Sequence, residues 1–121
     1  MEEQRKQRPE DKAIATKLAV ARASLTYRQG MKQVEAEWPT ATAASTIQGW
    51  SKAVEVLEGL YVQPQLTGYK DRIVEKLYAA HLNYGKALQA AGRNYEALGQ
   101  YQRALQIDKS RPEALDALKQ F

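Results

Sequence analysis

Residues 78–111 constrain the fold more than any other part of the chain, because they contain two helical patterns joined by a glycine. Gly85 lies in the middle of the first pattern, where a glycine costs roughly 1 kcal/mol relative to alanine, so a close approach by a second helix is the expected reason for it. Gly92 follows at the position of a helix C-cap. Ala97 and Ala104 share one face of the second helix. These spacings predict an antiparallel hairpin of two helices.

The hairpin resembles the tetratricopeptide repeat (TPR), a helix–turn–helix unit with a period of about 34 residues. The resemblance is carried by Tyr84, Gly85, Leu88, Gly92, Ala97, Tyr101, Ala104 and residues 106–108. The chain departs from the family at His81, where a large apolar residue is usual, and at Lys109, where proline is common. Tyr95 lies one place late for the aromatic residue of the turn. The resemblance implies a role in protein binding.

A degenerate repeat of the same kind is predicted before this one. Its second helix begins near Trp50 and repeats the spacings of the later hairpin at Ala53, Leu57 and Leu60. Its first helix is the stretch ending near Glu37, just before Pro39, with Gly30 as the close-contact glycine. Residues 39–49 are then an insertion, either a loop or a short weak helix.

The predicted fold class is all-α. Antiparallel helix hairpins of the TPR-like α-solenoid type are expected, with a long N-terminal helix and a C-terminal capping helix over residues 112–120. Residues 1–10 are predicted to be disordered or frayed. Residues 11–121 should form a single TPR-like helical domain. Ser51 or its neighbour, and Thr67, are the expected helix caps.

The N-terminal helix carries two apolar stripes. At about 100° per residue they lie on opposite sides of a straight helix, so the helix either breaks near residues 28–30 or buries both faces. The stripe nearer the repeats is assigned to the domain core and consists of Tyr27, Met31, Val34 and Trp38. The other is a candidate association stripe, exposed in an isolated monomer or covered by a partner, and consists of Ile14, Leu18, Ala21 and Leu25.

No residue pattern indicates an enzyme, a cofactor or a metal site. The chain has one histidine, His81, and no cysteine. A glycine-rich phosphate loop is also absent. The net charge of +4 is spread along the chain, whereas nucleic-acid-binding proteins concentrate basic residues on one face. No apolar run is long enough to span a bilayer, so we expect no membrane insertion by this segment.

A protein or peptide is the expected partner. The first helix of the later repeat offers a candidate partner-binding face on the edge away from its hairpin partner: Ala79, Leu82, Asn83, Lys86, Gln89 and Ala90. Asn83 and Lys86 supply an amide and an ammonium group, but Leu82 stands where a carboxylate clamp would need a basic residue. The alternative is self-association as a homodimer. The chain would then be a structural domain, or the interaction arm of a larger, membrane-anchored protein; the default localisation is cytoplasmic.

Overall fold

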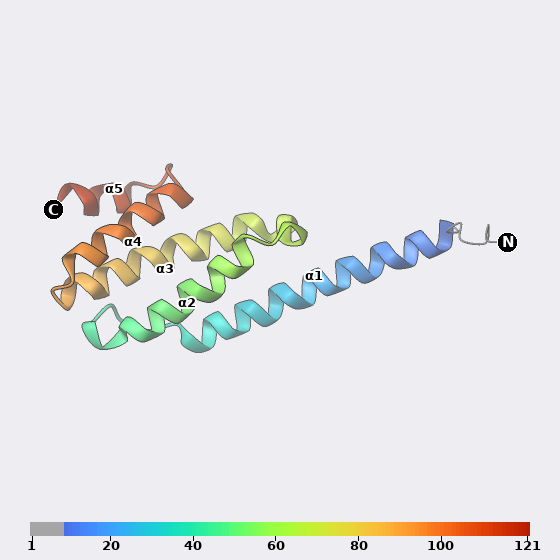
Figure 1. Cartoon of the computed structure of the whole chain (residues 1–121), viewed down its shortest axis with the longest axis horizontal. Coiled ribbons are helices and arrows are strands. Elements are labelled where there is room, and N and C mark those ends of the chain that lie inside the picture. The colour runs from blue at the N-terminus through green and yellow to red at the C-terminus, as the bar shows by residue number, and fades with distance from the viewer. Residues whose placement is uncertain (1–8) are drawn as a thin grey trace.

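A computed structural model describes residues 9–121, and every regular element in this part of the chain is a helix, with no strand. Figure 1 shows the five α-helices. The elements in chain order are α1 (Pro9–Glu37), the 3-10 helix η2 (Ala44–Thr46), α2 (Ile47–Tyr61), the 3-10 helix η3 (Pro64–Tyr69), α3 (Lys70–Ala90), α4 (Asn94–Ile107) and α5 (Pro112–Lys119). The all-α prediction is confirmed.

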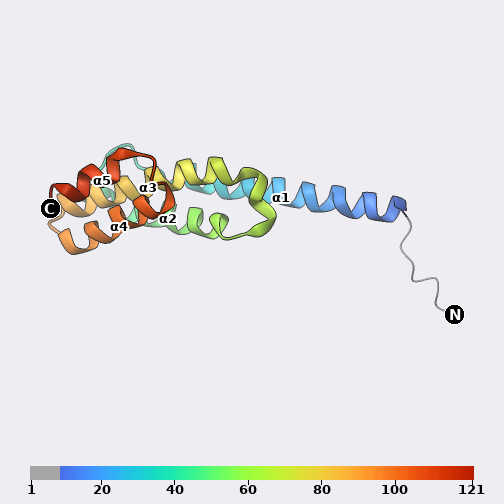
Figure 2. The same ribbon diagram turned by 90° about the horizontal axis from the view of Figure 1, so that it is seen from above.

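Each α-helix packs against the next one in the sequence, and successive helices run in opposite directions (Figures 1 and 2). The side chains between them form two buried clusters. One joins α1, α2 and α3 around Val34, Leu57 and Leu77. The other joins α3, α4 and α5 around Leu88 and Tyr101. Helix α3 contributes to both clusters and therefore lies at the centre of the fold.

The α3–α4 hairpin forms as its glycines predict. A Cβ atom on Gly85 would lie 2.5 Å from Cε1 of Tyr101, so the ring of Tyr101 occupies the space that the missing side chain leaves. Gly92 has a φ of 77°, the left-handed conformation that glycine adopts without a Cβ penalty. Its N–H donates to the carbonyl of Gln89 and the N–H of Arg93 to that of Leu88, both at 2.9 Å. This pair of bonds is the Schellman motif and ends α3.

The α1–α2 pair also meets at a glycine, but in a different register. A Cβ atom on Gly30 would lie 2.8 Å from the δ-carbons of Leu60, which confirms Gly30 as a close-contact glycine. In the later hairpin, however, the glycine faces Tyr101, and the counterpart of Tyr101 by spacing is Leu57. The first pair is therefore shifted by about one helical turn relative to the second.

The connection between α1 and α2 is held by the two tryptophans. Their rings meet edge to face at a centroid distance of 4.9 Å, and Trp50 Nε1 donates to the carbonyl of Ala41 at 3.1 Å. Pro39 packs so closely on Gly49 that a Cβ there would lie 2.8 Å from the proline Cγ. Residues 38–43 thus form a fixed loop that passes into η2, residues 47–49 already belong to α2, and α1 ends at Glu37 as predicted.

Several predicted helix boundaries are wrong. Residues 9 and 10 are helical, while residues 1–8 of the predicted frayed segment lie outside the described residues. Ser51 lies inside α2, which begins at Ile47, so it is not a cap. The hydroxyl of Thr67 donates to the carbonyl of Pro64 at 2.6 Å inside η3 and does not cap α3. The last helix ends at Lys119, one residue earlier than expected.

Helix α1 is continuous through residues 28–30, so the predicted break is wrong, and burial of both faces by a partner stays a prediction. The two apolar stripes lie on different stretches of one unbroken helix. Its C-terminal stretch packs as predicted: Val34 is fully buried, and Tyr27, Met31 and Trp38 are partly buried against the same cluster. Tyr27 also stacks on Tyr69 of η3 at 4.2 Å between ring centroids. The N-terminal stretch leaves the body of the protein.

Candidate protein-interaction surface

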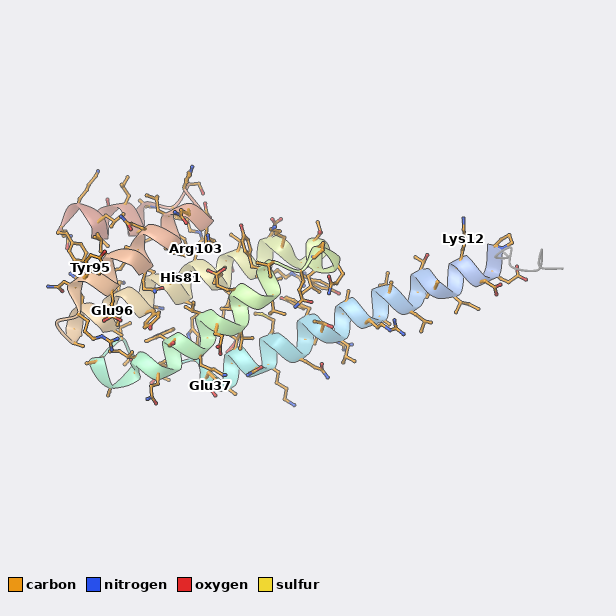
Figure 3. All side chains as sticks on the ribbon, viewed as in Figure 1. Lys12, Glu37, His81, Tyr95, Glu96 and Arg103 are labelled. Atoms are coloured by element: carbon orange, nitrogen blue, oxygen red, sulfur yellow. The ribbon has the colours of Figure 1, made fainter. Side chains whose placement is uncertain are left out.

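The N-terminal half of α1 projects from the helical body, as both ribbon views show (Figures 1 and 2). Every residue from 9 to 22 is exposed. Lys12 lies near the free end of the helix, far from the other labelled side chains (Figure 3). At 1.5 Å per residue these 14 residues extend about 21 Å. No other described helix buries a residue of this stretch.

The candidate association stripe lies along this projecting half. Ile14, Leu18 and Leu25 are 57%, 51% and 50% exposed, and Ala21 is exposed as well. The stripe points away from the side of α1 that packs on the rest of the protein, because Tyr27 and Val34 lie on the opposite side of the helix. It is therefore accessible along its whole length.

A second apolar feature was not expected from the sequence. Where α1 leaves the body, it forms an open groove with η3, with a volume of about 560 Å³. The groove is lined by Ala19, Val20, Ala23, Gln65, Gly68 and Tyr69. Val20 precedes the core residue Tyr27 by seven positions, so it continues the core side of α1 into solvent and is 62% exposed. The seven-residue spacing from Val20 to Tyr27 could have predicted the α1 side of this groove. The packing of η3 on α1 could not be predicted, because Pro64 and Gly68 in that segment indicate only a turn.

The candidate partner-binding face on α3 does not form one open edge, and this part of the prediction is wrong. Leu82 is buried, at 9% exposure, within the α3–α4–α5 cluster. Gln89 points toward α4, not away from it, because its Oε1 accepts a hydrogen bond from the Tyr101 hydroxyl at 2.6 Å. Ala79 and Asn83 are half-buried. Only Lys86 and Ala90 remain exposed without a described role in packing.

Helix α5 explains why this face is unsuited to a peptide carboxylate. Lys86 and Gln89 line a surface pocket of about 410 Å³ together with Glu113 and Asp116 of α5. Two carboxylates of the protein itself thus share the pocket with the lysine. A bound carboxylate would meet like charges there, which is unfavourable at short range.

His81, the lone histidine, is at the centre of a polar network that joins three helices. It is 3% exposed. Its Nε2 lies 2.8 Å from Oε2 of Glu58 on α2, and because a carboxylate only accepts, this nitrogen donates. Its Nδ1 lies 2.6 Å from Oε1 of Gln100 on α4. Figure 3 labels His81 and Arg103 near one another in the middle of the bundle. Both ring nitrogens therefore have protein partners.

Glu58 also binds Arg103 of α4 through two parallel hydrogen bonds of 2.8 Å, one to each carboxylate oxygen. The hydrogen bonds from Arg103 hold the pKa of Glu58 below its ordinary value, and the bond from His81 adds to them, whereas partial burial opposes the shift. The guanidinium lies over the ring of Tyr61, with 5.8 Å between the Arg103 Cζ and the ring centroid. The network fixes the relative positions of α2, α3 and α4.

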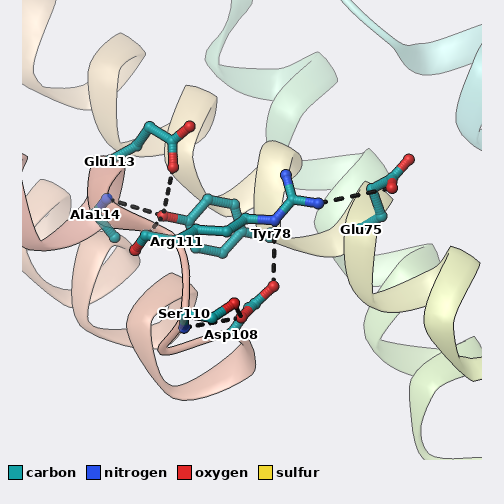
Figure 4. Close-up of polar contacts among 7 residues, drawn as sticks. All are labelled: Glu75, Tyr78, Asp108, Ser110, Arg111, Glu113 and Ala114. Atoms are coloured by element: carbon teal, nitrogen blue, oxygen red, sulfur yellow. Dashed lines mark hydrogen bonds and ion pairs between the residues drawn. The ribbon is translucent and has the colours of Figure 1, made fainter.

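A second network attaches α5 to α3 (Figure 4). The Tyr78 hydroxyl accepts a hydrogen bond from the backbone N–H of Ala114 at 2.9 Å and lies 3.4 Å from a carboxylate oxygen of Glu113. Because no side chain of α5 caps its N-terminus, Tyr78 takes that role from another helix. Burial raises the pKa of Tyr78 above its ordinary value. The guanidinium of Arg111 lies over the same ring and forms ion pairs with Glu75 and Asp108.

Among residues 9–121, no group of three or more histidine, cysteine, aspartate or glutamate side chains is arranged to hold a metal ion. None of the helices in this range combines the length and apolarity needed to cross a membrane. No family model, no curated protein and no solved structure matches the chain.

Proposed function

We propose that this protein is a non-catalytic protein–protein interaction module of the TPR type, and that it docks a partner helix on the projecting half of α1. One observation carries the proposal: Ile14, Leu18 and Leu25 form an exposed apolar stripe on the side of α1 that faces away from the helical body. Contiguous apolar surface of this kind is typical of interaction sites.

The energetics of the projecting helix favour a partner. Isolated helices shorter than about 12–15 residues are marginal in water, and most helix stability in proteins comes from packing of an apolar face. Residues 9–22 have no such packing. Full burial of a leucine or isoleucine side chain contributes about 1.5–3 kcal/mol, so covering a side chain that is already half buried contributes about 1 kcal/mol. Covering the three large side chains of the stripe would contribute about 3 kcal/mol.

The TPR assignment is supported by packing in the second hairpin. Helices α3 and α4 run antiparallel and meet where the ring of Tyr101 fills the space above Gly85, at the residues that carry the family resemblance. Helix α5 then covers the end of the stack with a mostly exposed outer face, as a capping helix does in solenoid proteins. In this proposal the repeats form a rigid base from which α1 extends.

Crosslinking inside cells tests the proposal. A photoreactive phenylalanine derivative replaces Leu18 in the stripe, and in a matched control it replaces Val62, which is 70% exposed but lies at the end of α2. We expect a discrete covalent adduct from position 18, identified by mass spectrometry, and none from position 62. Equal labelling at both positions, or no adduct at position 18, would refute a docking role for the stripe.

A further inference from the structure

The spacing of the association stripe is that of a short coiled-coil seam. Ile14, Leu18, Ala21 and Leu25 follow one another at intervals of four, three and four residues, the alternation of the d and a positions of a heptad repeat. We propose, building on the docking role of α1, that the partner is a second copy of this chain, and that the two α1 helices pair antiparallel through this stripe.

An antiparallel pair has one register in which the whole stripe is covered. Its two-fold axis passes between residues 19 and 20. Ile14 then faces Leu25 of the partner copy, and Leu18 faces Ala21 of the partner copy. Each leucine at position 18 therefore meets a small side chain, which lets the two helices approach closely. In the same register, the next layer beyond Ile14 and Leu25 at each end of the seam places Asp11 opposite Arg28 of the partner copy.

The charges flanking the stripe select this orientation. In a parallel pair in register, the residues that flank the seam face each other across it, which brings Lys17 of one helix beside Arg22 of the other. Arg28, in the next layer of the seam, would lie beside Arg28 of the partner copy. Like charges at these positions oppose pairing. In the antiparallel pair, each flanking g position faces a g position of the partner copy, and each e position faces an e position. Lys17 therefore lies beside Ser24, and Arg22 beside Ala15.

The outer layer adds attraction to the antiparallel arrangement. Asp11 and Arg28 have opposite charges, and the two-fold axis creates this pairing at both ends of the seam. A parallel pair would instead place Asp11 opposite Asp11. Specificity in coiled coils commonly comes from such a difference between an attractive and a repulsive arrangement.

The body of the protein leaves room for the second helix. The stripe lies on the side of α1 opposite Tyr27 and Val34, and the helices that cover those two residues lie beside the C-terminal half of α1 (Figure 1). In an antiparallel pair the two bodies lie at opposite ends. The seam from residue 11 to residue 28 is about 27 Å long. It is short for a permanent dimer, so we expect weak association that depends on concentration.

Disulfide trapping tests the orientation, because the chain has no cysteine of its own. Full-length Ile14→Cys and Leu25→Cys variants are oxidised separately and as a mixture. In the antiparallel register, positions 14 and 25 face each other, whereas two copies of position 14 are about 16 Å apart along the helix axis. Disulfides require Cα atoms within about 7 Å. We therefore expect a disulfide-linked dimer from the mixture and none from either variant alone.

Two controls make the result decisive. Val62→Cys, an exposed position outside the seam, measures disulfides formed by random collision. Leu18→Glu, with circular dichroism to verify folding, should weaken the dimer at least tenfold in sedimentation equilibrium. Efficient disulfides from each single variant would indicate parallel pairing and overturn the proposed orientation. A protein that stays monomeric at all concentrations, yet crosslinks from position 18 to a different protein, would overturn self-pairing while the proposed function stands.

Discussion

Replacing Gly85 by alanine tests the contact on which the α3–α4 hairpin depends. In an exposed helix, glycine to alanine stabilises by about 1 kcal/mol. At Gly85 the new methyl group would lie 2.5 Å from Cε1 and 2.8 Å from Cδ1 of Tyr101. That ring is 1% exposed and its hydroxyl is bonded to Gln89, so it has little freedom to move away. Overpacking of this kind costs about 1–3 kcal/mol.

The matched control is Gly99→Ala on α4, because nothing lies within 4 Å of a Cβ atom built at Gly99. We expect Gly99→Ala to stabilise by about 1 kcal/mol and Gly85→Ala to be neutral or destabilising by up to about 2 kcal/mol. The two variants should therefore differ by about 1–3 kcal/mol in urea denaturation followed by circular dichroism. If Gly85→Ala is as stable as Gly99→Ala, the close contact with Tyr101 does not exist and the hairpin register is wrong.

Three further predictions concern the polar networks and α1. Glu58→Gln removes the ion pair with Arg103 and should cost about 2 kcal/mol at pH 7. The folded-state pKa of Glu58 is lowered, so the wild-type advantage is complete above the unfolded-state pKa of about 4.3. The advantage should then decrease as the pH falls through the folded-state pKa, in a series of denaturation experiments from pH 7 downward. Tyr78→Phe leaves the N–H of Ala114 without its acceptor and should cost about 1–2 kcal/mol, with hydrogen exchange increasing first in α5; unchanged exchange there would contradict the capping role. Removing residues 1–22 should leave the melting temperature within a few degrees and abolish association in light scattering, whereas a collapse of helicity would show that this stretch supports the fold.

Local signals in the sequence predicted the second hairpin well. Gly85 and Gly92 each indicate a specific backbone requirement, and the structure meets both with Tyr101 and a left-handed C-cap. The burial of Leu82 was not predictable in the same way, because it depends on where α5 returns onto the stack. Periodicity says which residues share a face of a helix, but it does not say which later element will cover that face.

Long-range polar contacts could not be predicted from the sequence either. Glu58 belongs to no motif in the sequence, and its partner Arg103 is 45 residues away. No spacing rule connects two charges at that separation. The two stripes of α1 were recognised correctly, but their opposite directions suggested a break or a double burial. The structure excludes the break: α1 is unbroken and leaves the body between the two stripes, so that the first stripe is exposed in the single chain.

The link between Glu58 and Arg103 has a consequence for cooperativity. In a stack where each helix interacts only with its neighbours, the ends can open while the middle stays folded. Here α2 and α4 both pack on α3 and are also tied directly to each other, with His81 of α3 bonded to the same carboxylate. Opening of either helix pair therefore breaks a contact that the other pair shares. The two pairs should protect their amide protons as one unit, whereas residues 9–22 of α1, all of them exposed, can exchange independently of it.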